Sequence, residues 1–242
     1  METKRIPRLH PVHKVFKRIT DYWLNDASFL VLMVALVFTV FVLPILIDYG
    51  HVKILFVNIV FIFLFFTGIW MSDNKLLIGL TTILFLCQLV LRILRFSDLP
   101  VEYYLQERIV GLLNMMVFIF LNIRLLFRNY EINLFRIIGA INVYLLVAIL
   151  GAFALEVIQI SVGSSISGIS VDVPIKELTG VDQDFSAYIY FSLVSLTTVG
   201  YGDYLPVNIM SKMLAVMLST TGILYPAVVI AKLVGSSTGG KQ

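Results

Sequence analysis

The 242-residue chain has few charged residues and almost no cysteine. Charged residues make up 14% of the sequence and hydrophobic residues 59%. In an ordinary soluble domain roughly half the residues are apolar, so this composition excludes that class and indicates an integral membrane protein. The single cysteine, Cys87, excludes an intrachain disulfide. Because it lies inside an apolar run, we expect it to be an inert packing residue.

The residue patterns of catalysis are also missing. We find no Ser/His/Asp arrangement, metal-ligand spacing or phosphate-binding loop, and therefore expect neither an enzyme nor an organic cofactor. The net charge of +3 is small and concentrated near one end, which favours orientation in a bilayer over binding to nucleic acid. The first apolar run is long, begins only near Phe29 and lacks a small-residue cleavage site, so no cleavable signal peptide is apparent.

The first 28 residues form a basic segment. It contains Lys4, Arg5, Arg8, Lys14, Lys17 and Arg18 against few acids. Since positively charged flanks remain on the inner side of a membrane, residues 1–28 are predicted to be cytoplasmic. Apolar residues recur there at helical spacing, which favours a helix lying flat on the inner leaflet. The alternative is a mobile basic tail.

Six apolar runs are each about as long as the roughly 20 residues that cross a bilayer. They are Phe29–Ile47, Lys53–Trp70, Lys75–Leu94, Ile109–Phe127, Asn133–Ile160 and Ile209–Val234. The sequence thus predicts an all-α, multi-pass protein of the cell membrane with six transmembrane helices. With six crossings, both termini are expected in the cytoplasm.

The stretch Thr197-Thr198-Val199-Gly200-Tyr201-Gly202-Asp203 lies between the last two runs. Its glycines allow a backbone conformation that other residues resist, so that successive carbonyl oxygens can turn toward one line. The stretch follows Phe185–Leu196, which is long enough for a short helix whose C-terminal end would favour a cation. The order of apolar span, short helix, this stretch and apolar span resembles the pore module of tetrameric potassium channels.

This resemblance implies a re-entrant pore helix at 185–197 and a selectivity filter at 197–203, between the fifth and sixth helices. Carbonyl oxygens of Thr198, Val199, Gly200 and Tyr201, with Gly202 in the same segment, would bind dehydrated potassium ions, and the Thr198 hydroxyl would close the innermost cage. One loop supplies a quarter of each oxygen ring, so the expected partner is three further copies, as a homotetramer. Residues 29–130 would form a peripheral four-helix domain and residues 131–242 the pore domain.

Several residues are expected to support the filter. Thr197 and Asp203 flank it, and Val194 stands where some relatives place a glutamate that hydrogen-bonds the aspartate. Asp203 therefore needs another donor, for which the Tyr190 hydroxyl is the candidate. Glu156, near the end of the fifth run, is costly in an apolar helix without donors. We expect its partner on the pore helix or at the top of the sixth span, as a strut or else as a cation-attracting group.

Three residues of the sixth span are candidates for a gate or hinge. Gly222 stands where the family places a hinge glycine, and Tyr225-Pro226 follows one turn later. A proline inside a helix removes a hydrogen bond and kinks the helix. The alternative is that Gly and Pro are simply frequent in membrane helices.

The fourth span departs from voltage-gated members of the family, which carry a row of basic residues there. Between Ile109 and Phe127 it has only Arg124, near the inner end, while Glu102 and Glu107 are expected in an outer linker. Arg92 and Arg95 are expected to reach the outer headgroups, although displaced gating charges are an alternative. One charge crossing the field gains only about 2.3 kcal/mol per 100 mV, so we expect no meaningful voltage gating.

The function expected from the sequence is passive, potassium-selective permeation through a tetrameric pore. A potassium uptake transporter subunit is one alternative, although such proteins carry four non-identical loops in one chain. A non-conducting regulatory channel subunit is the other. Expected partners are the lipid bilayer and further copies of the chain, with a lipid or another regulator as a candidate for control.

Overall fold

The computed structural model describes residues 28–50, 54–70, 75–94, 102–126, 134–167 and 184–238. These ranges are helical apart from the turns and the loop that precedes α9. The helical elements are α2 (Ser28–Val37), η2 (Phe38–Val42), α3 (Leu43–Asp48), α4 (Ile54–Trp70), α5 (Lys75–Leu94), α6 (Glu102–Leu126), α7 (Leu134–Val162), α8 (Phe185–Leu196) and α9 (Ile209–Thr238). The proposed interfacial helix of the basic segment lies outside the described residues.

The predicted all-α fold is confirmed for the described ranges, and five of the predicted spans have candidate membrane-spanning helices. Five stretches are long and apolar enough to cross a membrane: Ser28–Asp48, Leu76–Leu94, Leu105–Leu126, Leu134–Val162 and Ile209–Lys232. The second predicted span is the shorter helix α4, with 17 residues. A crossing needs about 17–25 residues, so α4 lies at the lower limit and the sixth crossing stays a prediction.

The first span is one continuous helix with a widened turn in its middle. Pro44 has no N–H to give to the carbonyl four residues before it, and its ring crowds that turn. The turn next to Pro44 opens accordingly, because the Leu43 N–H reaches the Phe38 carbonyl five residues back. Such π-turns are an ordinary cause of a bend in a helix.

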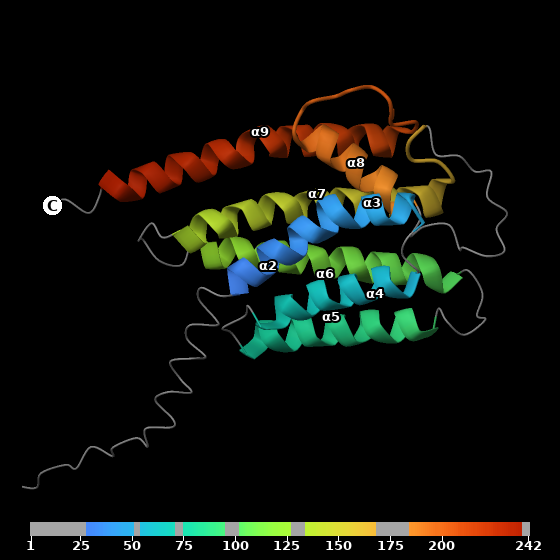
Figure 1. Cartoon of the computed structure of the whole chain (residues 1–242), viewed down its shortest axis with the longest axis horizontal. Helices are drawn as coiled ribbons and strands as arrows, with labels where there is room; N and C mark the ends of the chain where they lie inside the picture. Colours follow the sequence, from blue (N-terminus) through green and yellow to red (C-terminus); the bar gives the residue numbers. More distant parts are fainter. Residues whose placement is uncertain are drawn as a thin grey trace, which may run out of the picture.

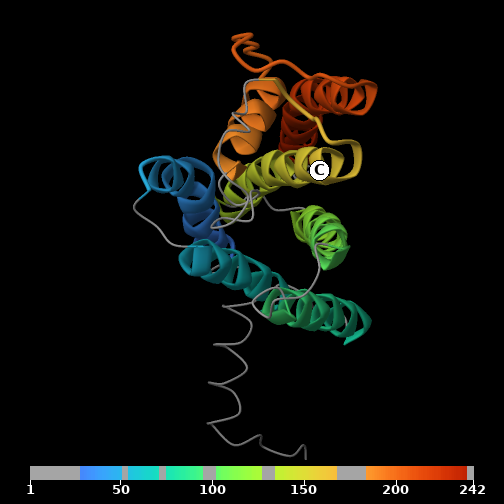
Figure 2. The same cartoon turned by 90° about the vertical axis from the view of Figure 1, so that its right-hand side faces the viewer.

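Helix α7 lies in the middle of the bundle (Figures 1 and 2). It packs against α2, α6, α8 and α9, whereas α5 lies farther out, against α4 and α6. The short helix α8 is inclined between α7, α9 and α3. The predicted division at residue 130 into a peripheral and a pore domain stays a prediction.

An aromatic cluster connects three of these helices in the core. The Phe61 ring of α4 lies 5.3 Å from the Phe153 ring of α7 and 5.2 Å from the Phe185 ring of α8, centroid to centroid. All three rings are buried. The Phe61–Phe185 pair is edge to face, which adds to the free energy gained from burial alone and fixes the start of α8 against α4.

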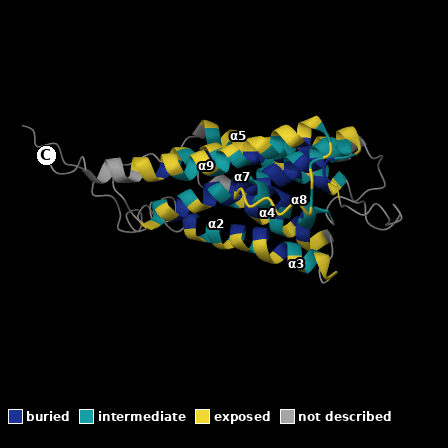
Figure 3. Cartoon of the chain, turned by 90° about the horizontal axis from the view of Figure 1, so that it is seen from above, coloured by how far each residue is buried: buried dark blue, intermediate teal, exposed yellow. Residues whose placement is uncertain are grey.

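Exposed apolar residues gather on the outward sides of the bundle, most clearly along α5 and α9 (Figure 3). On α9 they are Ile209, Met210, Met213, Val216, Met217, Ile223, Leu224, Val228 and Ile230. Cys87 is exposed on α5, so any partner that packs against it lies outside the single chain. A surface this apolar requires lipid or protein around it.

Candidate functional site

The segment Thr197–Asp203, which we call the filter segment, begins directly at the C-terminal end of α8. Its first three N–H groups turn back to that helix. Thr197 donates to the Leu193 carbonyl at 2.8 Å, Thr198 to Ser195 at 3.1 Å and Val199 to Val194 at 3.1 Å. The last carbonyls of a helix have no partner within it, so these bonds both cap α8 and attach the filter segment to it.

Every second residue of the filter segment has a positive φ. The angles are 59° at Thr198, 60° at Gly200 and 81° at Gly202. Glycine adopts this conformation without steric cost, whereas in threonine it is strained and must be held by its surroundings. Alternation of left-handed and right-handed residues brings successive peptide groups into the same orientation. Side chains of this segment are exposed in the single chain, Tyr201 by 73% and Val199 by 50%.

Asp203 is held by two donors. The Tyr190 hydroxyl of α8 donates to Oδ2 at 2.6 Å, and the Tyr204 N–H donates to Oδ1 at 3.0 Å. The Tyr190 and Tyr204 rings also meet edge to face, 5.7 Å apart. The hydrogen bond predicted from Tyr190 is therefore present. The apolar side chain of Val194 cannot donate a hydrogen bond to Asp203.

Removing the Tyr190 hydroxyl is expected to weaken the protein's resistance to acid. The hydrogen bond from Tyr190 holds the pKa of Asp203 below its ordinary value, because it favours the ionised carboxylate. A lowered pKa stabilises the fold above the unfolded pKa of about 4, and this contribution is lost as the pH falls through the lower folded value. In Tyr190→Phe the pKa of Asp203 in the folded protein rises, so acid unfolding should begin at a higher pH. Circular dichroism during an acid titration measures this.

Tyr204→Phe is the matched control for this prediction. It removes a hydroxyl from the neighbouring ring and keeps the Tyr204 N–H that donates to Asp203. Equal acid midpoints for wild type, Tyr190→Phe and Tyr204→Phe would show that the Tyr190 hydroxyl contributes nothing at Asp203.

A short two-stranded bridge ties the loop after the filter segment to the end of α7. Ile166 pairs antiparallel with Pro206. Around this pair, the Ser167 N–H donates to the Leu205 carbonyl at 2.8 Å and the Val207 N–H to the Ser165 carbonyl at 3.0 Å. Sequence reasoning missed these residues because a Gly/Ser-rich stretch has no hydrophobic period that would reveal a strand.

Asn208 closes the loop and starts α9. Its side-chain Oδ1 accepts from the Ser211 N–H at 2.9 Å, its own N–H donates to Ser211 Oγ at 3.2 Å, and its Nδ2 donates to the Ser164 carbonyl. The first two bonds form a reciprocal N-terminal cap. The third joins this cap to the end of α7, so both ends of the loop that contains the filter segment are fixed.

Gly222 lies where α9 crosses the C-terminal end of α8. A Cβ atom built there would lie 1.6 Å from the Leu196 carbonyl oxygen. Helix α9 continues through Pro226, and the Tyr225 hydroxyl donates to the Ala140 carbonyl of α7 at 2.9 Å. Glycine at position 222 thus permits the close packing of α9 against α8, and Tyr225 anchors α9 to α7. Their role as a hinge or gate stays a prediction.

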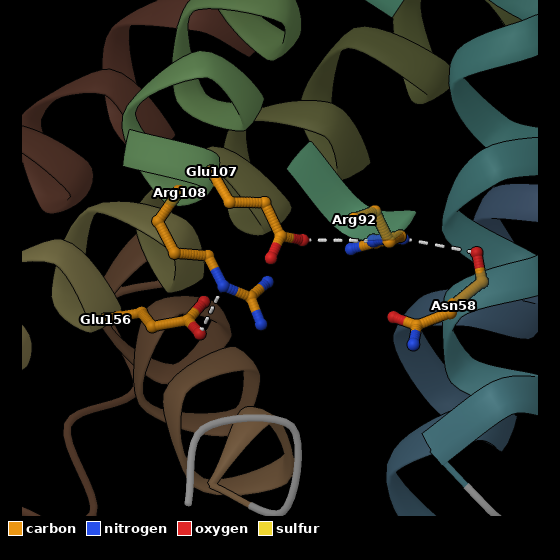
Figure 4. A network of polar contacts seen from close by, with 5 residues as sticks. All are labelled: Asn58, Arg92, Glu107, Arg108 and Glu156. Carbon is orange, nitrogen blue, oxygen red and sulfur yellow. Dashed lines mark hydrogen bonds and ion pairs between the residues drawn. The ribbon is translucent and has the colours of Figure 1, made fainter. Parts of the chain in front are cut away.

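Among the described residues, four charged side chains are buried away from the filter segment. Figure 4 shows Glu107 and Arg108, neighbours on α6, turned toward different partners. Arg92 Nε of α5 donates to Glu107 Oε1 at 3.0 Å, and Arg108 Nε donates to Glu156 Oε1 of α7 at 2.8 Å. No side chain of the four is more than 3% exposed. Arg92 Nη1 also donates to the Asn58 carbonyl of α4 at 3.2 Å.

These pairs correct two predictions. Arg92 does not reach toward headgroups, because Glu107 holds it inside the bundle; Arg95 lies outside the described residues. Glu156 pairs with Arg108 of α6, an element on which the sequence did not place its partner. The cause is the start of α6 at Glu102, which brings Glu107 and Arg108 into the helix, whereas Glu107 is expected from the sequence in the linker before Ile109.

The fold and these contacts define an α-helical membrane protein with a short helix and a left-handed, glycine-rich loop between its last two long helices. Residues 143–236 match a family model described as ion channel. The match begins in α7 and includes α8, the filter segment and nearly all of α9, and it supports an ion channel. No curated protein and no solved structure matches the chain significantly.

Proposed function

We propose that the protein is a potassium-selective channel in which four copies surround one pore. The observation that carries this proposal is the filter segment, with positive φ at Thr198, Gly200 and Gly202, fixed between α8 and the end of α7 inside the region that matches the ion channel family. Four such segments would stack their carbonyl oxygens into rings that replace the hydration shell of potassium. Ions then pass down their gradient, each displaced by the next.

The exposed residues favour an assembly of four chains over a single chain. Val199 and Tyr201 are exposed in the single chain, as is the apolar face of α9 from Ile209 to Ile230. In a tetramer, part of this face would contact neighbouring copies and part would line the inner cavity, whereas the outward sides of α2 and α5 would face lipid. We place the assembly in the cell membrane, with both termini cytoplasmic according to the basic first segment.

We further propose that opening depends little on voltage. Arg92 and Arg108 are matched by Glu107 and Glu156, so the buried quartet of α5, α6 and α7 is neutral as a whole. Moving α6 would carry Glu107 and Arg108 together, and their opposite charges cancel. Since one uncompensated charge gains only about 2.3 kcal/mol per 100 mV, this helix has little charge with which to sense the field. A lipid or another regulator is then the candidate stimulus.

A planar-bilayer recording of the purified protein, with potassium on one side and sodium on the other, tests the proposal. The reversal potential should follow the potassium gradient, and open probability should change only weakly as the voltage is stepped. Equal sodium and potassium permeability would overturn the filter assignment. A steep rise of open probability with voltage would overturn the absence of voltage gating alone.

Gly200→Ala provides the matched filter variant for this recording. A Cβ at position 200 would meet nothing within 4 Å, but φ is +60°, so the variant adds backbone strain without a clash inside the chain. A left-handed conformation costs an L residue about 1–2 kcal/mol. Potassium current should fall strongly in Gly200→Ala while each protomer keeps its fold by circular dichroism; unchanged current would remove this segment from the ion path.

A further inference from the structure

The C-terminal end of α8 receives side-chain hydrogen bonds from two other helices. The Tyr144 hydroxyl of α7 donates to the Leu196 carbonyl at 3.2 Å. The Ser219 hydroxyl of α9 lies 2.9 Å from the Ser195 carbonyl and 3.0 Å from the Ala215 carbonyl, so it shares one proton between them. We call Tyr144 and Ser219 the α8 clamp. We propose that the α8 clamp positions the entrance of the filter segment and so sets how tightly that segment holds potassium.

The hydrogen bonds at the end of α8 show why the Tyr144 bond matters. The carbonyls of Leu193, Val194 and Ser195 accept N–H groups from Thr197, Val199 and Thr198, so they belong to the local turn. The Leu196 carbonyl accepts instead from Tyr144, on a different helix. Because a peptide unit is planar, fixing this carbonyl also fixes the direction of the next N–H, at Thr197.

Thr198 follows immediately and needs such support. Its φ of 59° is uncommon for a threonine, and a strained backbone persists only where neighbouring contacts over-determine it. The Tyr144 bond acts on the peptide two residues before Thr198, and the Ser219 bond acts on the carbonyl that also accepts the Thr198 N–H. Both therefore act where the left-handed alternation begins, next to the innermost proposed ion site.

The close approach of α9 restricts the same carbonyl from another side. The backbone at Gly222 leaves no room for a Cβ beside the Leu196 oxygen. Leu196 is thus confined between the Tyr144 hydroxyl of α7 and the backbone of α9. The first residues of the filter segment are thus held from two sides, by a hydroxyl of α7 and by the backbone of α9.

Tyr225 offers a matched comparison for Tyr144. Its ring lies 6.4 Å from the Tyr144 ring, and its hydroxyl also donates to a backbone carbonyl, that of Ala140, at 2.9 Å. Tyr225→Phe removes the same kind of bond from the same aromatic pair, but between α9 and α7, without touching α8. A difference between the two variants therefore reports the contact with α8 and not the general loss of a partly buried hydroxyl.

The clamp rests on the proposed function, and thermal unfolding of the purified protein tests it. Potassium is titrated while sodium keeps the ionic strength constant. A ligand that binds the folded protein raises its unfolding temperature according to affinity. Tyr144→Phe should raise the potassium concentration for half-maximal protection about fivefold, the factor for one net hydrogen bond. Ser219→Ala should raise it less, because its proton is shared. Tyr225→Phe should leave it unchanged while lowering the unfolding temperature.

Two results would overturn the inference in different ways. If Tyr144→Phe, Ser219→Ala and Tyr225→Phe all keep the wild-type potassium dependence, the hydroxyls only hold the helices together and the clamp is refuted. If the wild-type protein gains no more stability from potassium than from sodium, the filter assignment itself fails and the clamp fails with it. Because the second result is read from the wild type, the two failures are distinguishable. Ser219→Ala keeps the test decisive even if Tyr144→Phe does not fold.

Discussion

Replacing Gly222 with alanine is expected to remove conduction and to lower the unfolding temperature strongly. The added Cβ would lie 1.6 Å from the Leu196 carbonyl oxygen and 2.7 Å from its carbon. Backbone atoms on both sides cannot rotate away as a side chain can, so α9 or the end of α8 must move. Overpacking of a close contact costs about 1–3 kcal/mol and occasionally more, and here the shift also displaces the start of the filter segment.

Gly79→Ala is the control for this prediction. Gly79 lies inside α5, where an added Cβ meets nothing within 4 Å. Alanine in an exposed helix interior is favoured over glycine by about 0.5–1 kcal/mol, so Gly79→Ala should leave conduction intact and be neutral or slightly stabilising. The comparison also separates two roles of Gly222. If Gly222→Ala unfolds at the wild-type temperature and only its opening changes, bending of α9 matters more than packing.

The parts of the fold that follow from apolar length could be predicted from the sequence. The pore helix is predicted at 185–197, and α8 spans Phe185–Leu196, so the two agree within one residue. The long helices α7 and α9 likewise match their predicted runs within a few residues. Hydropathy succeeds here because backbone groups in a membrane have few alternatives to a helix.

The charged end of α6 could not be predicted in the same way. The charges of Glu107 and Arg108 each disfavour a membrane position when they are counted alone, and from the sequence Glu107 is therefore expected in a linker, with the fourth span beginning at Ile109. Their cost falls only when Arg92 of α5 and Glu156 of α7 are brought beside them. Such pairing depends on which helix faces lie together, which one-dimensional spacing does not contain. For the same reason, the contact of Tyr144 with Leu196 could not be predicted, because the two residues lie far apart in the sequence.

Glu156→Gln is expected to destabilise the protein severely. The substitution leaves the Arg108 guanidinium, whose side chain is 3% exposed, without its carboxylate partner at 2.8 Å. Breaking a buried pair by removing one charge costs about 3–5 kcal/mol, because the remaining charge stays in a medium of low dielectric constant. Thermal unfolding in detergent should therefore show a large loss of stability, and α6 should be less firmly attached to α7.

Removing both charges together separates the net stability that the ion pair contributes from the cost of leaving one buried charge without its partner. In the double variant Arg108→Gln with Glu156→Gln no charge is left behind, and two amides can still hydrogen-bond, so most of the lost stability should return. Arg124→Gln, a change at an exposed residue of the same helix, should stay within about 0.5 kcal/mol of wild type. A double variant as unstable as Glu156→Gln would mean that α6 is held to α7 by the attraction between the two charges. Recovery would mean instead that the pair contributes little net stability and that its buried charges serve to fix which faces of α6 and α7 meet.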